Sequence, residues 1–167
     1  MARGVVALAP VAVAGAVVIA GCSPKEKLVP VAPTDPKVNA AIAQARATLP
    51  TFWEKFDNQA PGVTHYEVKA KLVTPRGCCE HIWVDVESHN DLAVRGTLAN
   101  NPVELTGVRF GSEITFGPER ISDWLYQKNG KIYGGYTVRA LAERMSPEEQ
   151  RQAERQLSPT PLETGAH

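Results

Sequence analysis

An apolar run at the N-terminus decides how much of this 167-residue chain is left to fold. Arg3 gives the run a positive start, no charged residue interrupts residues 5–20, and residues 19–22 read Ile-Ala-Gly-Cys. A basic start, an apolar centre and small residues before a cleavage point are the layout of an export signal, which is removed and takes no part in the fold. We therefore expect residues 1–21 to be a signal peptide, and the folded body to come from the sequence that follows.

The end of this run resembles the bacterial lipobox, in which a diacylglycerol is attached to the cysteine and the signal is cut directly before it. The resemblance implies a mature chain that begins at lipid-modified Cys22 and is held on a membrane outside the cytosol. Each buried methylene contributes about 0.8 kcal/mol, so two or three acyl chains attach stably. Ser23 stands where Asp would retain an enteric lipoprotein on the inner membrane, which favours the outer membrane if the cell is Gram-negative.

A retained transmembrane helix is the alternative for this segment. The run is nearly long enough to cross about 30 Å of hydrocarbon. Pro10 breaks it, and the small residues before Cys22 suit a peptidase better than a membrane anchor. The signal peptide is therefore the interpretation that we carry forward.

Composition limits what the remaining sequence does. Eighteen basic and eighteen acidic side chains cancel, so no long-range field attracts nucleic acid, and we expect no nucleic-acid partner. Residues 23–36 contain four prolines, a composition that favours extended backbone over a packed core. We expect residues 22–36 to be a lipid-modified cysteine with a flexible tether, residues 37–157 a single α+β domain, and residues 158–167 a disordered tail.

The periodicity of the chain changes from helical to strand-like after residue 60. Thr34 or Asp35 is placed to cap a helix that begins near Pro36 and ends before Pro50, with a second short helical piece after it. Residues 64–73 alternate between apolar and charged side chains, which predicts a strand with one solvated face. Residues 80–99 predict a hairpin, and residues 107–116 add further strand.

The C-terminal third predicts one more hairpin and then helices. Asn129-Gly130 is a tight-turn signal between two short apolar segments. Thr137 is placed to cap a helix, and Ser146-Pro147 opens a second, very polar one. The fold class is therefore α+β: a curved antiparallel sheet of four to six strands, flanked by an N-terminal helix and a C-terminal helix.

Several short motifs resemble one bacterial family in their order and spacing. They are Glu80-His81-Ile82-Trp83-Val84, Gly96-Thr97-Leu98, Asn101-Pro102, Gly111, Ile121-Ser122-Asp123-Trp124 and Gly135-Tyr136-Thr137-Val138-Arg139. The family is the uncharacterised YegJ-like family, domain of unknown function 2314, and the resemblance covers about residues 50–145. It implies no reaction, cofactor or catalytic residue.

Asp123, Trp124, Tyr136 and Arg139 form the best candidate constellation for binding, with Trp83 as a further aromatic. A carboxylate beside an indole, with a guanidinium one hairpin away, suits a charge-assisted pair next to an aromatic wall that holds a polar ligand. The structural alternative is that Asp123 caps the following turn and Arg139 locks the C-terminal helix to the sheet. Both interpretations remain open on the sequence alone.

Cys78-Cys79-Glu80-His81 invites a metal interpretation, since thiolate and imidazole are ligands of zinc and copper. The spacing argues against it, because structural zinc sites separate their cysteines by two or more residues. In an oxidising compartment the two neighbours are candidates for a vicinal disulfide or for pairing with other chains. We expect neither a metal site nor a bound cofactor.

None of the common catalytic signatures appears in the sequence. His81 and Asp85 share a strand face and supply an acid and a base in principle, although charged residues on a strand are usually its solvated side. The expected function is a non-enzymatic binding or interaction module of the cell envelope, for a protein or a small polar ligand. The alternative is an envelope hydrolase that uses His81 or Asp123.

Overall fold

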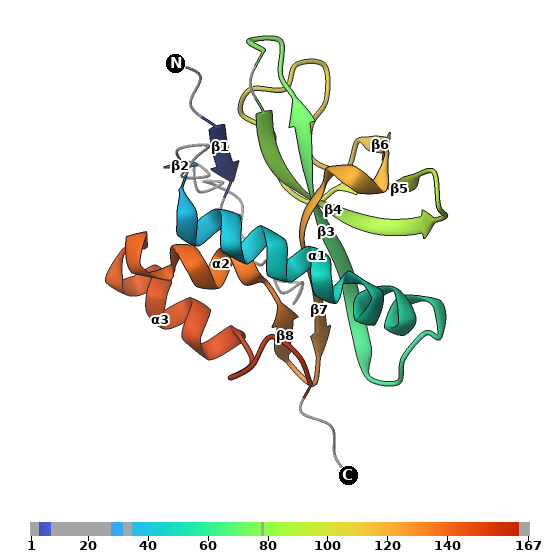
Figure 1. Cartoon of the computed structure of the whole chain (residues 1–167), viewed down its shortest axis with the longest axis vertical. Coiled ribbons are helices and arrows are strands. Elements are labelled where there is room, and N and C mark those ends of the chain that lie inside the picture. The colour runs from blue at the N-terminus through green and yellow to red at the C-terminus, as the bar shows by residue number, and fades with distance from the viewer. Residues whose placement is uncertain (1–3, 8–27, 32–34, 78, 164–167) are drawn as a thin grey trace, which may run out of the picture.

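The computed structural model describes residues 4–7, 28–31, 35–77 and 79–163 of the chain. Within these residues it has three α-helices and eight strands, which Figure 1 shows as a sheet with helices packed against it. The elements in chain order are β1 (Gly4–Ala7), β2 (Leu28–Val31), α1 (Pro36–Asp57), β3 (Val63–Val73), β4 (Cys79–His89), β5 (Val94–Leu98), β6 (Glu113–Phe116), β7 (Ile121–Lys128), β8 (Lys131–Gly134), α2 (Tyr136–Leu141) and α3 (Pro147–Gln156). Two single-turn 3-10 helices, η1 (Pro118–Arg120) and η2 (Ala142–Arg144), complete the described elements.

Strands β3 to β8 form the antiparallel sheet of an α+β fold, as the sequence predicts. β3 lies at its centre between β4 and β7, and β8 pairs with β7. β5 pairs with the second half of β4, and β6 pairs with β5. The sheet does not close into a barrel, so β5 and β6 extend away from the helices (Figure 1).

β1 and β2 add to this sheet from the segment before the domain. They pair with each other, and β1 lies parallel to the start of β4, with Val5 opposite Glu80 and Val6 opposite His81. The remaining residues of the expected signal peptide and tether, Cys22 included, lie outside the described residues. The lipid anchor therefore stays a prediction. In the part of the chain that the structure describes, no helix combines the length and the apolar character needed to cross a membrane.

α1 is one continuous helix that crosses one face of the sheet (Figure 1). The Asp35 carboxylate accepts a hydrogen bond from the Val38 N–H at 3.1 Å, and Pro36 occupies the first turn, where its missing N–H removes no helical bond. The predicted break at Pro50 is wrong. Phe52, on the far side of this proline, is fully buried in the core, and this packing offsets the hydrogen bond that Pro50 removes.

The core beneath α1 consists of side chains that alternate along the strands. Val68 and Ala70 of β3, Ile82 and Val84 of β4, and Trp124 of β7 are buried against it. The Trp124 and Phe52 rings have centroids 5.7 Å apart. This half of the sheet face is therefore fully covered.

The hairpin turn and the third helix match the sequence signals in detail. Asn129 and Gly130 both have positive φ, at 50° and 73°, which a two-residue turn between twisted strands requires. Ser146 and Glu149 form a capping box at the start of α3. Gly135, in the left-handed conformation, caps α2 instead of the expected Thr137, which lies inside the helix.

Residues 158–163, the described part of the expected disordered tail, lie against β8. The Ser158 N–H donates to the Ile132 carbonyl at 2.8 Å, and the Gly134 N–H donates to the Pro161 carbonyl at 2.7 Å. The polar composition of this segment predicts disorder, but its backbone supplies partners to an open strand edge. The domain therefore includes these residues, whereas residues 164–167 lie outside the described ones.

Glu163 fastens this segment to the sheet. Its carboxylate accepts a hydrogen bond from the Tyr126 hydroxyl at 2.9 Å and from Lys128 Nζ at 2.7 Å, and it pairs with Lys55 at 3.1 Å. Burial acts to raise the pKa of Glu163, but these donors outweigh it and lower the pKa to about 2. The segment is held by a carboxylate that stays ionised.

Candidate functional site

Asp123 lies in the interior, where its carboxylate organises the start of α2. It accepts hydrogen bonds from the backbone N–H groups of Trp124, Tyr136 and Thr137 at 2.9, 3.1 and 2.7 Å. The Thr137 hydroxyl donates a fourth at 2.6 Å. Burial raises the pKa of Asp123, while Lys69 and these donors act to lower it. The side chain is 0 % exposed, so all its bonding is directed into the fold.

Lys69 completes this arrangement, which we call the Asp123 cluster: Asp123, Lys69 and Thr137. Lys69 Nζ donates to the Thr137 hydroxyl at 2.9 Å and lies 4.5 Å from the centroid of the Trp83 ring. Burial lowers the pKa of Lys69 to about 8, although the carboxylates of Asp123 and Glu67 act to raise it. The prediction of a solvated face on this strand is wrong at Lys69, because Trp83 and Thr137 cover it.

The three candidate aromatics are also interior residues. Trp124 is fully buried, and its Nε1–H donates to the Ala45 carbonyl of α1 at 2.9 Å. Trp83 lies on the other face of the sheet, with Leu125 and Ile132. Tyr136 meets Trp124 edge-on at a centroid distance of 5.7 Å. The aromatics thus belong to two different packing clusters instead of lining one opening.

Arg139 holds the C-terminal segment to the sheet. Its Nε donates to the Gly134 carbonyl at 2.9 Å, and its Nη1 donates to the Ser158 carbonyl at 2.9 Å. Nη2 donates to the Ser158 hydroxyl at 3.1 Å. These contacts correspond to the structural alternative for Asp123 and Arg139, in which each fixes a junction between elements.

His81, one of the two residues of the hydrolase interpretation, is half-buried in β4. Its Nδ1 and the Ser122 hydroxyl are hydrogen bonded at 2.8 Å. Burial, followed by the positive charges of Lys69, Lys71 and Arg46, lowers the pKa of His81 to about 3, so the ring is neutral at physiological pH. His81 therefore has the protonation state of a base, with its Nδ1 engaged inside the fold.

Glu67 and Asp85 are two carboxylates directly opposite each other on β3 and β4. Burial and the charge of Asp85 raise the pKa of Glu67 to about 7, against the opposing effect of Lys69. Burial likewise raises the pKa of Asp85. Like charges on facing strands repel, so the position of Asp85 disfavours the ionised form of Glu67.

The cysteine motif is described only in part. Cys79 begins β4 with a free, half-buried thiol, whereas Cys78 lies outside the described residues. The disulfide between them stays a prediction. Among the described residues, no group of three or more His, Cys, Asp or Glu side chains is placed to hold a metal ion.

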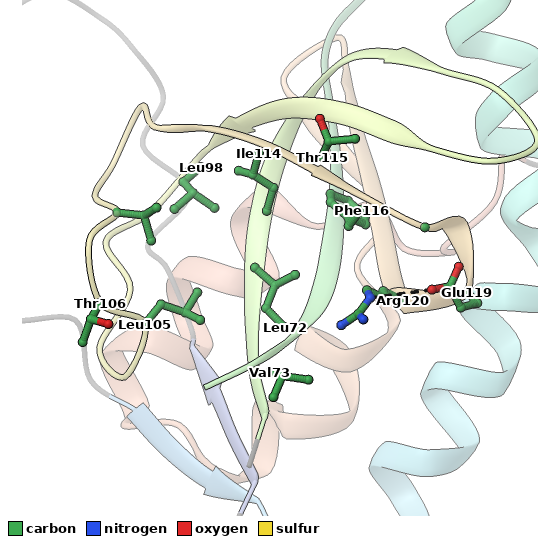
Figure 2. Close-up of a pocket in the computed structure, with 12 residues that line it drawn as sticks. Leu72, Val73, Leu98, Leu105, Thr106, Ile114, Thr115, Phe116, Glu119 and Arg120 are labelled. Atoms are coloured by element: carbon green, nitrogen blue, oxygen red, sulfur yellow. Dashed lines mark ion pairs between the residues drawn. The ribbon is translucent and has the colours of Figure 1, made fainter. Parts of the chain in front are cut away.

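An open groove of about 600 Å³ is lined by the end of β3, by β5 and β6, by the loop between them and by η1. Figure 2 shows Ile114 and Phe116 of β6 entering it from one side and Leu72 of β3 from the other. Glu119 and Arg120 lie at one end. We call this surface the apolar groove; its lining is Leu72, Val73, Leu98, Leu105, Thr106, Val108, Ile114, Thr115, Phe116, Gly117, Glu119 and Arg120.

The loop between β5 and β6 forms one wall of the apolar groove, and its backbone is held by Glu80. This carboxylate, fully buried in β4, accepts hydrogen bonds from the N–H groups of Val103, Glu104 and Leu105 at 2.8, 3.0 and 3.1 Å. A carboxylate with three backbone donors is a strong anchor for a loop without regular secondary structure. The wall is therefore shaped by main-chain contacts.

Large apolar side chains are exposed at the end of β3 and in the β5–β6 loop, and two of them, Val73 and Val108, line the groove. Val73 is 60 % exposed, Phe110 62 % and Val103 51 %, and all three belong to the end of β3 or to the β5–β6 loop. Exposed apolar side chains that line a groove are candidates for contact with another molecule. No motif predicts this surface, and its signal in the sequence is the four large apolar residues between the turn residues 100–102 and Gly111.

Comparisons with known proteins match most of the domain described above. Residues 35–158 match the bacterial family described as "Uncharacterized protein conserved in bacteria (DUF2314)". The chain is 37 % identical over 102 residues to "Uncharacterized protein YegJ" of Escherichia coli K12, covering 60 % of this chain and 64 % of that protein.

A second relative carries additional sequence. The chain is 33 % identical over 122 residues to a Neisseria meningitidis serogroup B protein named "Putative ankyrin repeat protein", covering 69 % of this chain and 48 % of that protein. The chain thus spans between about half and two thirds of the length of these relatives. No solved structure matches it. From the family match across most of its length, this chain belongs to the DUF2314 family of bacterial proteins.

Proposed function

We propose that this protein is a lipid-anchored binding module of the bacterial cell envelope that engages a partner protein through the apolar groove. The observation that carries the proposal is the groove itself: an open cavity whose lining includes seven aliphatic or aromatic side chains, of which Val73 and Val108 are exposed. Binding sites in proteins are typically concave and largely apolar, with few charged groups. Glu119 and Arg120 are the charged residues of this lining.

The residues expected to bind a polar ligand support this choice by their position. Asp123 and Trp124 are fully buried, and Arg139 is engaged by three carbonyl or hydroxyl partners of the chain. An envelope hydrolase that uses His81 or Asp123 needs these side chains to reach a substrate. A binding surface that is already open requires no such rearrangement, which favours the binding module.

The partner class follows from surface chemistry and from one relative. A relative of this chain is named for ankyrin repeats, and such repeats stack into extended binding surfaces. A domain of this family joined to such repeats supports a role in protein–protein contact. The location follows from the sequence: a Cys22 anchor and a proline-rich tether would hold the domain close to a membrane.

The anchor is tested by mass spectrometry of the N-terminal peptide, together with fractionation of cells that carry Cys22→Ala. We expect wild-type protein in the membrane fraction with a diacylated Cys22, and the variant either unprocessed or released. An unmodified Cys22 that still follows residues 1–21 would overturn the lipid anchor.

The binding surface is tested separately by photo-cross-linking in the native host. A cross-linking amino acid at Ile114 in the groove should capture a discrete partner, and the same amino acid at Glu154 on the polar helix α3 should not. Leu72→Glu places a charge in the apolar groove and should abolish the Ile114 adduct. Equal adducts from both positions, or an adduct that survives Leu72→Glu, would contradict a specific groove site.

A further inference from the structure

We infer that the apolar groove receives an extended segment of a partner protein, which adds as a strand to the free edge of β6. This inference deepens the proposed function and rests on the groove being the binding surface. It goes further by naming the conformation of the bound segment, the pattern of its side chains and the backbone groups that hold it.

The edge of β6 is open. Among the strands that the structure describes, β6 pairs only with β5. Strand edges carry unpaired N–H and C=O groups that readily accept another strand, and native proteins usually cover or charge them. Ile114 and Thr115 form the middle of this edge and carry no charge.

The hydrogen bonds to β5 show which groups face outward. The Leu98 N–H donates to the Ser112 carbonyl at 3.0 Å, and the Gly111 N–H donates to the Leu98 carbonyl at 2.8 Å. Bonded pairs alternate along an antiparallel ladder, so the next bonded pair is Gly96 with Ile114. The N–H and C=O groups of the intervening β6 residues, Glu113 and Thr115, therefore point away from β5.

These outward groups lie at the rim of the groove. Figure 2 shows the side chains of Ile114 and Phe116 directed into the groove and that of Thr115 directed away from it. Thr115 nevertheless belongs to the lining of the groove. One surface thus offers both the hydrogen bonds and the apolar contacts that strand addition uses.

The geometry specifies the side-chain pattern of the bound segment. A strand directs alternate side chains to opposite faces, so every second residue of the segment enters the groove and must be apolar. The four residues of β6 span about 13 Å, which suits a segment of four to six residues. An isolated acyl chain would fill the apolar walls but leave the outward N–H groups without partners.

Arg120 sets a preference at one end of the segment. Its guanidinium is 3.6 Å from the Glu119 carboxylate, with both side chains well exposed, at 42 % and 72 %. Such exposed pairs contribute little and exchange readily with other partners. An acidic residue at this end of the bound segment therefore replaces Glu119 at small expense.

The test uses a synthetic eight-residue peptide in which Val and Leu alternate with Thr and which ends in Glu. A control peptide has the same composition with Val and Leu grouped together. Both are labelled for fluorescence anisotropy against the full chain held in lipid nanodiscs, and hydrogen–deuterium exchange is followed over residues 113–116. We expect the alternating peptide to bind at least tenfold more tightly and to slow exchange at β6.

Two variants separate strand addition from apolar burial. Thr115→Pro removes an outward N–H that β5 does not use, and proline is tolerated at a strand edge, so binding should fall at least tenfold while the fold is kept. Asp91→Pro, in the exposed turn between β4 and β5, is the matched control and should bind as wild type. Ile114→Glu charges the groove and should also abolish binding.

The outcomes distinguish the two proposals. Loss in Thr115→Pro with slowed exchange in wild type supports strand addition. Unchanged binding in Thr115→Pro with loss in Ile114→Glu overturns strand addition but leaves the groove as a binding site. The same conclusion follows if oleate displaces the peptide and binds wild type and Thr115→Pro equally. Unchanged binding in Ile114→Glu overturns both proposals.

Discussion

The Asp123 cluster and the apolar groove lie on opposite faces of β3, and they differ in which side chains they bury and which they expose. In the cluster, charged groups are withdrawn from water and every hydrogen bond is directed into the fold. In the groove, apolar groups from β3 and β6 are left open to water. A buried, satisfied carboxylate serves stability, whereas apolar surface that the fold leaves uncovered is free to meet another molecule.

The largest expected effect on stability comes from a substitution of Asp123. Asp123→Ala removes the acceptor of four hydrogen bonds and leaves Lys69 buried without its carboxylate, so we expect a loss of about 3–5 kcal/mol in the free energy of unfolding. Urea unfolding followed by tryptophan fluorescence measures it. Asp91→Ala, an exposed turn residue, is the control, and a loss below about 1 kcal/mol at Asp123 would show that the cluster does not hold the fold.

Glu67 sharpens the comparison, because burial and the facing Asp85 carboxylate both oppose its ionised form. Its pKa is raised to about 7, so between the unfolded value near 4.5 and pH 7 the folded state binds the extra proton, and stability falls as pH rises. Glu67→Gln mimics the protonated form. Relative to wild type it should gain about 1–2 kcal/mol at pH 8, after allowance for solvent screening, and almost nothing at pH 4.

Thermal unfolding at the two pH values measures this difference. Glu154→Gln on α3 is a control for a charge removed from an exposed position. A gain of the same size at pH 4 and pH 8 would mean that packing, and not ionisation, distinguishes the variant.

The smallest expected effect on stability belongs to the β5–β6 loop, which forms one wall of the groove. Phe110 is 62 % exposed, so Phe110→Ser should change the free energy of unfolding by less than about 0.5 kcal/mol, while it weakens capture of the partner at the groove. Unfolding and the cross-linking yield from Ile114 are measured on the same preparation. A large loss of stability would show that Phe110 belongs to the core, and the contrast between cluster and groove would fail there.

Local signals in the sequence were enough for most of the fold. The strand over residues 64–73, the Asn129-Gly130 turn and the helix start at Ser146-Pro147 each depend on a few neighbouring residues, and each appears as predicted, although Lys69 of that strand is buried. The predicted helix end at Pro50 is wrong because Phe52 is buried against a distant strand. This packing outweighs the tendency of proline to end a helix. The contacts of residues 158–163 with β8 are likewise invisible to composition.

The candidate site was harder to predict for the same reason. Asp123 and Arg139 have the chemistry of a ligand site, and only the tertiary arrangement shows that backbone groups already occupy them. The groove is bounded by β3, β5 and β6, whereas α1 packs mainly over β7, and no motif encodes this placement. Exposed apolar residues in the β5–β6 loop were the available signal, but burial must be known before they stand out.

Glu80 has a consequence for how this family can diversify. Because its carboxylate grips main-chain amides, which every residue except proline supplies, the loop keeps its course whatever side chains it carries at positions such as Val103 and Leu105. The side chains of the loop can then change without a change in the backbone that carries them. Relatives that keep a glutamate here are free to vary the side chains of this loop on one common backbone.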